Sequence, residues 1–290
     1  MKLSCGHRTL DLATPAVMGI LNLTADSFSD GGDFLRPEGL DLDAILRRAE
    51  AMVGAGARIL ELGAESTRPG ASPVPVNLEL DRIATALEVL APRVDAVISV
   101  DSSAPQVFTA AAAAGAGMLN DVRALSRDGA LEAAAATGLP VCLMHMQGEP
   151  GTMQEDPRYD DLVTEVRDFL ITRMEAARFA GIPRERILLD PGFGFGKTLA
   201  HNVELLAELE RIVELGPPVL VGMSRKGMIG RLTGRTLDAR VAGSVAAAAL
   251  AVDRGARIIR VHDVAETVDA VAVAAAVAGM APVDETVDQT

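Results

Sequence analysis

Groups that can bind a ligand or a metal stand at the ends of a series of short apolar runs in this sequence. Each run is rich in Val, Ile, Leu and Met, as buried strands are, and each ends in side chains that a hydrophobic core excludes. These side chains are Asn22, Glu65 with Ser66 and Thr67, Asp101, Asn120, His145, Asp190, Ser224, and Arg260 with His262. Burying any one of them without a partner would cost about 2 kcal/mol or more, so the series predicts a site that holds a ligand or water.

Asp101, Asn120 and Asp190 carry the groups needed to recognise a flat heterocycle. A carboxylate accepts two parallel N–H bonds from an amidine-like edge, such as that of guanine or a pterin. An asparagine adds one donor and one acceptor. For Asp101 another interpretation stays open, because the segment SSAPQVF that follows makes it a candidate N-cap of a helix.

Three basic residues, Lys226, Arg260 and His262, are predicted to lie around the same opening and to bind an anion. Lys226 directly precedes an expected helix, and a helix N-terminus favours negative charge. Arg260 stands between Ile259 and Val261 inside an apolar run, where a solvated arginine would be misplaced. Solvated surface charge is the alternative for Lys226 and Arg260.

The segment DPGFGFGKT, residues 190–198, has the glycines of a phosphate-binding loop but not their spacing. The Walker pattern requires a glycine five residues before the Gly-Lys pair, and Pro191 stands there. We expect a glycine-rich loop that lets Phe193 or Phe195 approach a flat ligand, with a plain turn as the alternative. The four histidines and two cysteines show no zinc spacing, so an oxygen-liganded Mg²⁺ brought by a phosphorylated substrate is the expected metal.

The elements that would position these residues alternate between strand and helix. Helical patterns fill the gaps between the apolar runs, among them residues 42–56, 159–181 and 240–255. This alternation predicts an α/β fold, a (β/α)8 TIM barrel of one domain over residues 1–280 with a short N-terminal extension, and a disordered tail over 281–290. A doubly wound sheet is the alternative. The expected strands are 16–22, 58–65, 96–101, 117–122, 140–146, 186–192, 218–224 and 257–263.

In such a barrel the carboxyl ends of all strands meet at one mouth, so polar residues far apart in the sequence would form a single ring. The composition suits this fold, because 49% hydrophobic but only 3% aromatic residues indicate an aliphatic core of parallel strands covered by Ala-rich helices. The net charge of −13 argues against nucleic acid and anionic membrane as partners.

The apolar windows 241–252 and 270–280 are too short to span a bilayer, which takes about 20 residues. The start MKLSCGHRTL lacks the apolar segment of a secretory signal. Cys5 and Cys142 lie far apart in the sequence, as reduced thiols would. A cytoplasmic protein is expected.

The segments MGILNLTADSFSDGG, ESTRPGA, SVDS, LND, LMHMQGEPGTMQ, LDPGFGFGKT, LVGMSRK and RVHDVAET, in this order and spacing, closely resemble the dihydropteroate synthase family. The similarity covers roughly residues 10–275. It implies a (β/α)8 barrel that joins 4-aminobenzoate to (7,8-dihydropterin-6-yl)methyl diphosphate and releases pyrophosphate in folate biosynthesis.

The resemblance also implies a role for each matched residue. Pterin contacts fall on Asp101, Asn120, Asp190 and Lys226, with Met144 as an apolar wall; diphosphate and Mg²⁺ contacts fall on Asn22, Arg260 and His262; and the aminobenzoate pocket falls on Thr67, Arg68, Pro69, Phe195, Ser224 and Lys226. Asn22 is the expected metal ligand. The residues expected to act in catalysis are Asp30, Asp101, Lys226 and Arg260.

The implied mechanism is SN1-like, with the diphosphate leaving before the amine attacks. Residues 25–31 would close over the diphosphate as a lid and place Asp30 near the reacting carbon. A turn residue before Gly31 and Gly32 is the plain alternative for Asp30.

Two other functions remain open. One is a pterin-binding methyltetrahydrofolate methyltransferase domain, which has no diphosphate to bind, and the other is a non-catalytic pterin-binding paralogue. The family resemblance further implies a homodimer, formed through Ala-rich late helices such as residues 240–255.

Overall fold

The computed structural model describes residues 1–24, 34–36, 39–65 and 74–281, and a closed parallel barrel forms its centre. Eight strands hydrogen-bond in the order β10-β9-β8-β7-β6-β3-β12-β11. The two edges then meet, because Leu189 on β10 pairs with Val219 and its N–H donates to the carbonyl of Pro218 at 3.0 Å. The expectation of a (β/α)8 barrel is confirmed. The strands are β3 (Ala16–Asn22), β6 (Ile59–Gly63), β7 (Val97–Asp101), β8 (Met118–Asp121), β9 (Val141–Met144), β10 (Ile187–Asp190), β11 (Leu220–Val221) and β12 (Ile258–Val261).

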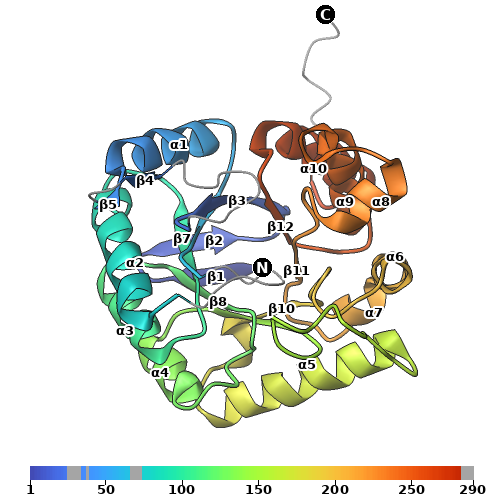
Figure 1. Ribbon diagram of the computed structural model, residues 1–290, viewed down its shortest axis with the longest axis horizontal. Helices are drawn as coiled ribbons and strands as arrows, with labels where there is room; N and C mark the ends of the chain where they lie inside the picture. The colour runs from blue at the N-terminus through green and yellow to red at the C-terminus, as the bar shows by residue number, and fades with distance from the viewer. Residues whose placement is uncertain (25–33, 37–38, 66–73, 282–290) are drawn as a thin grey trace, which may run out of the picture.

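The helices surround the strands in the order of the chain (Figure 1). They are α1 (Leu42–Gly54), α2 (Val76–Leu90), α3 (Pro105–Ala113), α4 (Ala130–Thr137), α5 (Leu162–Phe179), α6 (Leu199–Ala207), α7 (Glu210–Val213), α8 (Gly227–Thr233), α9 (Val241–Asp253) and α10 (Val264–Val277). Short 3-10 turns occupy Arg184–Arg186 and Leu237–Ala239, and β4 (Leu35–Arg36) pairs with β5 (Gly39–Leu40). Among the described residues, no helix is both long enough and apolar enough to cross a membrane.

The seventh strand is shorter than the sequence indicates. We expected residues 218–224, and β11 contains only Leu220–Val221. Pro217 and Pro218 cannot donate to a ladder, and the chain turns directly afterwards, where the N–H of Lys226 donates to the carbonyl of Met223 at 3.1 Å. The early end of this strand frees the segment 222–226 to line the mouth of the barrel.

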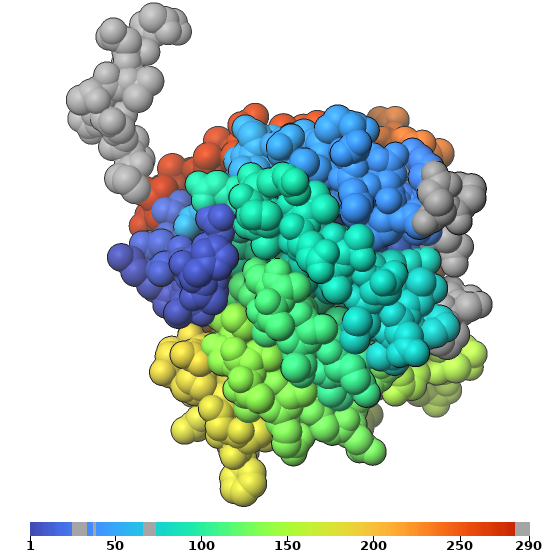
Figure 2. Space-filling model, turned by 90° about the vertical axis from the view of Figure 1, so that its left-hand side faces the viewer, coloured from blue at the N-terminus to red at the C-terminus, as the bar shows by residue number. Residues whose placement is uncertain are grey.

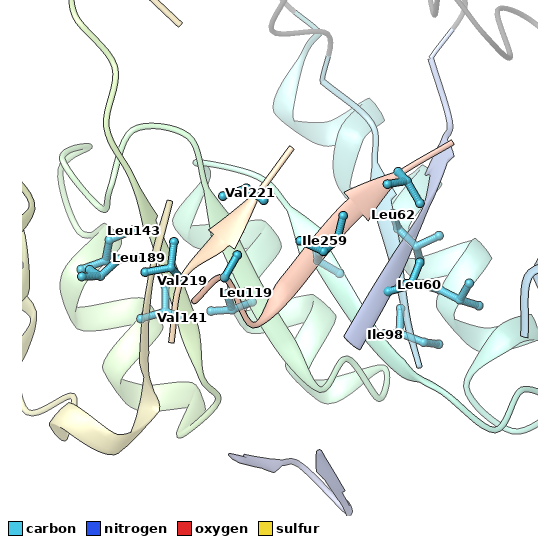
Figure 3. Packing of buried hydrophobic residues seen from close by; sticks show 14 of the residues in the cluster. Leu60, Leu62, Ile98, Leu119, Val141, Leu143, Leu189, Val219, Val221 and Ile259 are labelled. Atoms are coloured by element: carbon cyan, nitrogen blue, oxygen red, sulfur yellow. The ribbon is translucent and has the colours of Figure 1, made fainter. Parts of the chain in front are cut away.

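The outward side of the strands packs against the helices. Leu60, Leu62, Ile98, Leu119 and Ile259 are all buried in one cluster with the inner faces of the helices (Figure 3). A fully buried side chain of this size stabilises the fold by about 1.5–3 kcal/mol. This belt holds the strand ends in fixed positions around the mouth.

The inward side chains change character along the barrel axis. Since side chains alternate along a strand, every second residue points inward. At the amino ends of the strands these residues are apolar and form a separate buried cluster of Ala16, Met18, Ile59, Val97, Met118, Cys142, Leu188, Leu220 and Ile258. Two or four residues further along the same strands, the inward positions carry the polar residues of the mouth.

An N-terminal hairpin closes the apolar end of the barrel. Strand β1 (Lys2–Cys5) pairs antiparallel with β2 (Arg8–Asp11), and Leu3, Cys5, Leu10 and Leu12 join the inner apolar cluster. The hairpin lies within the ring of helices when the barrel is viewed as in Figure 1, and the side view shows it at one end of the molecule (Figure 2, dark blue). The expected N-terminal extension is therefore a plug. Residues 282–290, which make up most of the predicted tail, lie outside the described residues.

Candidate active site

The polar ends of the strands line one cavity of about 590 Å³ at the mouth of the barrel. Ten predicted site residues lie on its wall: Asn22, Asp101, Asn120, Met144, Asp190, Phe195, Ser224, Lys226, Arg260 and His262. The other four, Asp30, Thr67, Arg68 and Pro69, lie outside the described residues. Residues from both ends of the sequence thus share one wall, as the convergence of parallel strands requires.

A buried carboxylate that the sequence reasoning missed organises one side of the cavity. Glu61, in the middle of β6, is fully buried. One of its oxygens accepts a hydrogen bond from Arg260 Nε, and the other accepts one from Asn120 Nδ2 at 2.9 Å. Arg260 is conspicuous in the sequence because it is a charged residue inside an apolar run. Glu61 has the same signal in the run ILELG, so the same criterion identifies it.

Asp101 lies beside this ion pair. Its Oδ2 is 3.5 Å from Arg260 Nη2, so Arg260 faces two carboxylates. Burial, and next to it the charge of Glu61, raises the pKa of Asp101 well above that of an ordinary aspartate, while Arg260 opposes the shift. The helix-cap alternative for Asp101 does not hold, because the N-cap of α3 is Ala104.

Asp190 on β10 stands at the start of the glycine-rich loop. Its Oδ1 accepts a hydrogen bond from the N–H of Gly192 at 2.7 Å. Burial raises the pKa of this carboxyl, and the positive charge of Lys226 is the strongest influence against the rise. The side chain is 6% exposed and lines the cavity, so it meets a ligand as a largely desolvated acceptor.

Lys226 connects the loop after β11 with the glycine-rich loop. It is the N-cap residue of α8, its ammonium donates to the carbonyl of Phe193, and its Nζ lies 4.6 Å from the centre of the Phe195 ring. Burial lowers the pKa of Lys226 to about 8. The ammonium thus makes a cation–π contact with the ring of Phe195, and the carboxyl of Asp190 is its counter-charge.

The glycine-rich loop folds back against the segment after β9. Gly192 has a positive φ of 72°, and a Cβ built on it would overlap the carbonyl oxygen of His145. Only glycine fits so close an approach. Of the two candidate aromatics, Phe193 is fully buried in the core and Phe195 lines the cavity. The loop is therefore both a tight turn and the support of one aromatic wall.

A buried lysine fastens this loop from inside. Lys197 Nζ lies 2.9 Å from the carbonyl of Gly192, 3.1 Å from that of Phe195 and 2.9 Å from His145 Nδ1. Burial lowers the pKa of Lys197 to about 7, and burial with the charge of Lys197 lowers the pKa of His145 to about 2. Neutral His145 therefore accepts through Nδ1, and three acceptors match the three N–H donors of the ammonium. Asn202 holds the same loop from α6, accepting from the N–H of Gly194 at 2.6 Å.

Ser224 and His262 face each other across β11 and β12. The Oγ of Ser224 accepts from the N–H of His262 at 3.2 Å and lies 3.1 Å from its Nδ1. Arg225, between Ser224 and Lys226 in the sequence, has a positive φ of 57°. Its guanidinium pairs with Asp263, with Nε 2.9 Å from Oδ2. This fork holds a left-handed residue in place and so fixes the direction of Ser224 and Lys226 on either side.

Glu65, the polar residue that follows β6, is held on the cavity wall by an arginine. Arg123 Nη1 lies 3.2 Å from Glu65 Oε2 and 3.0 Å from Ser103 Oγ, and Asp121 accepts from the backbone N–H of Arg123 at 2.8 Å. These contacts fix the chain immediately before residue 66.

The donor set for a divalent cation is small but suitable. Among the described residues there is no group of three His, Cys, Asp or Glu side chains that would hold a metal alone. Gly63 leaves a gap into which a Cβ would project, 3.9 Å from Asn22 Oδ1 and 4.0 Å from Asp101 Oδ2. Oxygen ligands from one or two residues, completed by water and phosphate, are typical of Mg²⁺, so these residues fit the ion.

Comparisons with known proteins agree with this geometry. A family model described as pterin binding enzyme matches residues 18–262. The dihydropteroate synthase of Escherichia coli strain K12 is 53% identical over 273 residues, which cover 94% of this chain and 95% of that protein. The crystal structure of Yersinia pestis dihydropteroate synthase with a sulfonamide drug complex has a TM-score of 0.92 at 51% identity, covering 97% of this chain and 100% of that one. Dihydropteroate synthase from Xanthomonas albilineans in complex with 7,8-dihydropteroate has a TM-score of 0.85 at 49% identity, with coverage of 97% and 100%.

A closed barrel whose mouth holds acids, an amide and cations defines a class of enzyme that binds a flat, hydrogen-bonding heterocycle together with an anion. The chain belongs to the family of pterin-binding enzymes, and its relatives place it with the dihydropteroate synthases, which are transferases.

Proposed function

We propose that the cavity condenses 4-aminobenzoate with (7,8-dihydropterin-6-yl)methyl diphosphate, giving 7,8-dihydropteroate and pyrophosphate. The observation that carries the proposal is the meeting of buried acids and cations on one wall, with Asp190 and Asn120 for a heterocycle and Arg260 and His262 for an anion. The Xanthomonas albilineans relative in complex with 7,8-dihydropteroate supports it, because that molecule contains both joined parts.

The pterin ring binds to the acids and the amide of the cavity floor. Asp190 accepts two N–H bonds from the amidine-like edge of the ring, a charge-assisted pair that is stronger than neutral hydrogen bonds. Asp101 and Asn120 lie on neighbouring strands and contact the ring from the other side, and Met144 is its apolar wall. Lys226 approaches the ring carbonyl as a donor.

The diphosphate lies toward Arg260, His262 and Asn22. Positive charge placed where the leaving group gains negative charge stabilises the transition state more than the bound substrate. The C–O bond breaks first, and the cation left on the methyl carbon is stabilised by the electron-rich dihydropterin ring and by the carboxylate of Asp101. Asp30 and the lid of residues 25–31 belong to this step as well, and lie outside the described residues.

Aminobenzoate needs positioning more than activation, because its amine is neutral at pH 7 and already carries a lone pair. The carboxylate binds to Ser224 Oγ, and Phe195 with Lys226 covers the aromatic ring. Thr67, Arg68 and Pro69 complete this pocket. The amine attacks the methyl carbon and forms the C–N bond, and the resulting ammonium transfers its extra proton to solvent water.

Mg²⁺ is the proposed metal, held by Asn22 beside the gap at Gly63 and by the phosphates of the substrate. When bound, the ion would neutralise part of the charge of the diphosphate.

A methyltetrahydrofolate methyltransferase domain is the other enzyme that such a barrel could be. The substrate of such a methyltransferase carries no diphosphate. The presence of Lys226, Arg260 and His262 in one cavity therefore favours the reaction of the pterin diphosphate.

The decisive assay measures pyrophosphate release with each substrate alone and with the two together. We expect release only with both, and inhibition by a sulfonamide that aminobenzoate reverses. Pyrophosphate release that does not depend on aminobenzoate, or no release with both substrates present, would contradict the proposed reaction.

A homodimer through α9 and α10 is also proposed. These packed helices expose Leu250, Val273 and Val277, at 47%, 67% and 79% of their surface. Apolar side chains on adjacent helices suit an interface with a second copy. For the compartment we propose the cytoplasm, because Cys5 and Cys142 are buried free thiols, as in reducing surroundings.

A further inference from the structure

Glu61 contacts two residues that the proposed reaction uses for opposite ends of the same substrate. Its Oε2 accepts from Arg260 Nε, on the diphosphate side, and its Oε1 accepts from Asn120 Nδ2, on the pterin side. The carboxylate is fully buried on β6, so these contacts replace all of its hydration. No part of the proposed chemistry requires Glu61 to touch the substrate.

The contact with Asn120 determines how that amide is turned. A carboxylate only accepts hydrogen bonds, so the NH2 group of Asn120 must face Glu61 and the oxygen must point away. This oxygen is buried on a residue that lines the cavity, and within the described part of the chain it has no hydrogen-bond partner. A buried acceptor without a partner is unfavourable until a donor reaches it.

We infer that Glu61 is a positioning residue which aligns the guanidinium of Arg260 and at the same time turns the Asn120 amide, so that the pterin meets an oxygen that accepts one of its N–H groups. This inference rests on the proposed function. The inference adds to the proposed function that Glu61, which the ligand does not touch, determines whether one wall of the pterin pocket offers a hydrogen-bond acceptor or a donor.

The substitution Glu61→Gln tests the polarity. A glutamine has one oxygen, which the positive charge of Arg260 attracts, and its NH2 group then faces the NH2 group of Asn120. The Asn120 amide must turn over or move away, so the pterin meets a donor where it had an acceptor. We expect kcat/KM to fall about 100-fold, as for the loss of hydrogen bonds to charged groups, with KM for the pterin diphosphate rising more than KM for aminobenzoate.

The single variant Asn120→Asp tests the same contact from the other side. It places a second carboxyl against Glu61, and two neighbouring carboxyls favour holding one proton between them. Its remaining activity should therefore move toward lower pH relative to the unchanged protein.

The double variant Glu61→Gln with Asn120→Asp restores the pattern. The introduced glutamine can accept from Arg260 and donate to the introduced aspartate, the total charge is that of the original pair, and an oxygen is again free for the pterin. We expect the double variant to regain at least about tenfold in kcat/KM over each single variant, with its pH profile back near the original. Glu88→Gln, on the exposed side of α2, is the matched control and should change nothing.

The outcomes separate the inference from the proposed function. If the unchanged protein does not bind the pterin diphosphate in calorimetry, the proposed function fails. If it does, and the double variant folds but is no better than either single variant, the inference about Glu61 fails. Thermal melting of all four proteins shows which are folded, and if Glu61→Gln is not, recovery in the double variant relative to Asn120→Asp still decides the matter.

Discussion

Lys197 and His145 form a buried pair in which Nζ and Nδ1 are 2.9 Å apart. The lysine also holds the carbonyls of Gly192 and Phe195, so one ammonium group ties both ends of the glycine-rich loop to the end of β9. Phe195, which the loop carries into the cavity, depends on this connection.

Replacing Lys197 with methionine should therefore weaken the proposed aminobenzoate pocket. The change leaves the carbonyls of Gly192 and Phe195 without their donor, at a cost of about 1–3 kcal/mol for each buried group. We expect KM for aminobenzoate to rise about tenfold, and to rise more than KM for the pterin diphosphate, in steady-state kinetics. Gln154→Ala, which removes an exposed contact to the carbonyl of Gly194, is the control. Equal losses for the two substrates would contradict a specific effect on Phe195.

The substitution Asp190→Asn should abolish tight binding of the pterin diphosphate. An amide offers one acceptor where the carboxylate offers two charged ones, and hydrogen bonds to charged groups contribute about 1.5–3 kcal/mol each. We expect affinity in calorimetry to fall about 100-fold or more. Asp168→Asn, on the exposed side of α5, serves as control. Unchanged affinity would mean that Asp190 does not bind the ring.

Turnover should decline at alkaline pH because of Lys226. Burial holds its pKa at about 8, so the ammonium loses its charge above that pH, and the proposed contacts to the ring carbonyl and the aminobenzoate lose that charge as well. The variant Lys226→Arg stays charged at these pH values, and its kcat/KM, whatever its absolute level, should lack the decline. A decline that persists in the arginine variant would assign it to another group.

Lys226 affects stability in the opposite direction, because its contribution to the free energy of unfolding increases as pH rises. The pKa of Lys226 is about 8 in the barrel against 10.5 for the ordinary side chain, so between these values the unfolded chain binds more protons. The contribution of Lys226 to the free energy of unfolding thus increases as pH rises from about 8 to 10.5, and is lowest below 8. Denaturant titrations of the protein and of Lys226→Met should differ in this window.

Gly192→Ala should destabilise the whole barrel. The residue has a φ of 72°, and the added methyl would overlap the carbonyl oxygen of His145, so backbone must move. We expect a loss of about 3 kcal/mol or more in chemical unfolding. Gly54→Ala, at the end of α1 with open space around it, should be neutral or stabilise by up to about 1 kcal/mol.

The proposed dimer predicts a change in mass. Leu250→Glu on α9 would place a charge in the interface, and sedimentation should then show a monomer at concentrations where the unchanged protein is a dimer. Phe179→Glu, at the far end of α5 and 97% exposed, should leave the mass unaltered. A monomer before any substitution would remove the proposal.

The barrel and its ring of polar residues could be predicted because each strand carries its own local signal. An apolar run that ends in Asn22, Asp101 or Asp190 indicates both the strand and the side chain at its carboxyl end. Position in the ring then follows from the topology of parallel strands alone. These residues could be placed at the mouth of the barrel without information on side-chain contacts.

Other features depend on contacts between segments, and the sequence does not state them. The pattern GFGFGK gave no indication that Lys197 turns into the interior, because its three acceptors come from two different loops. The short β11 reflects two prolines and the turn at Met223, which an apolar run conceals. Glu61 differs from these, since a charged residue inside an apolar run is itself a signal in the sequence.

In the described part of the chain, the hairpin of β1 and β2 and the apolar side chains packed behind it close the barrel at the amino ends of its strands. Asn120, Asp190 and Ser224 all line the cavity at the other end, so substrates and product use the same opening at the carboxyl ends of the strands. The closed end therefore contributes stability, and ligands meet only the residues of the open end.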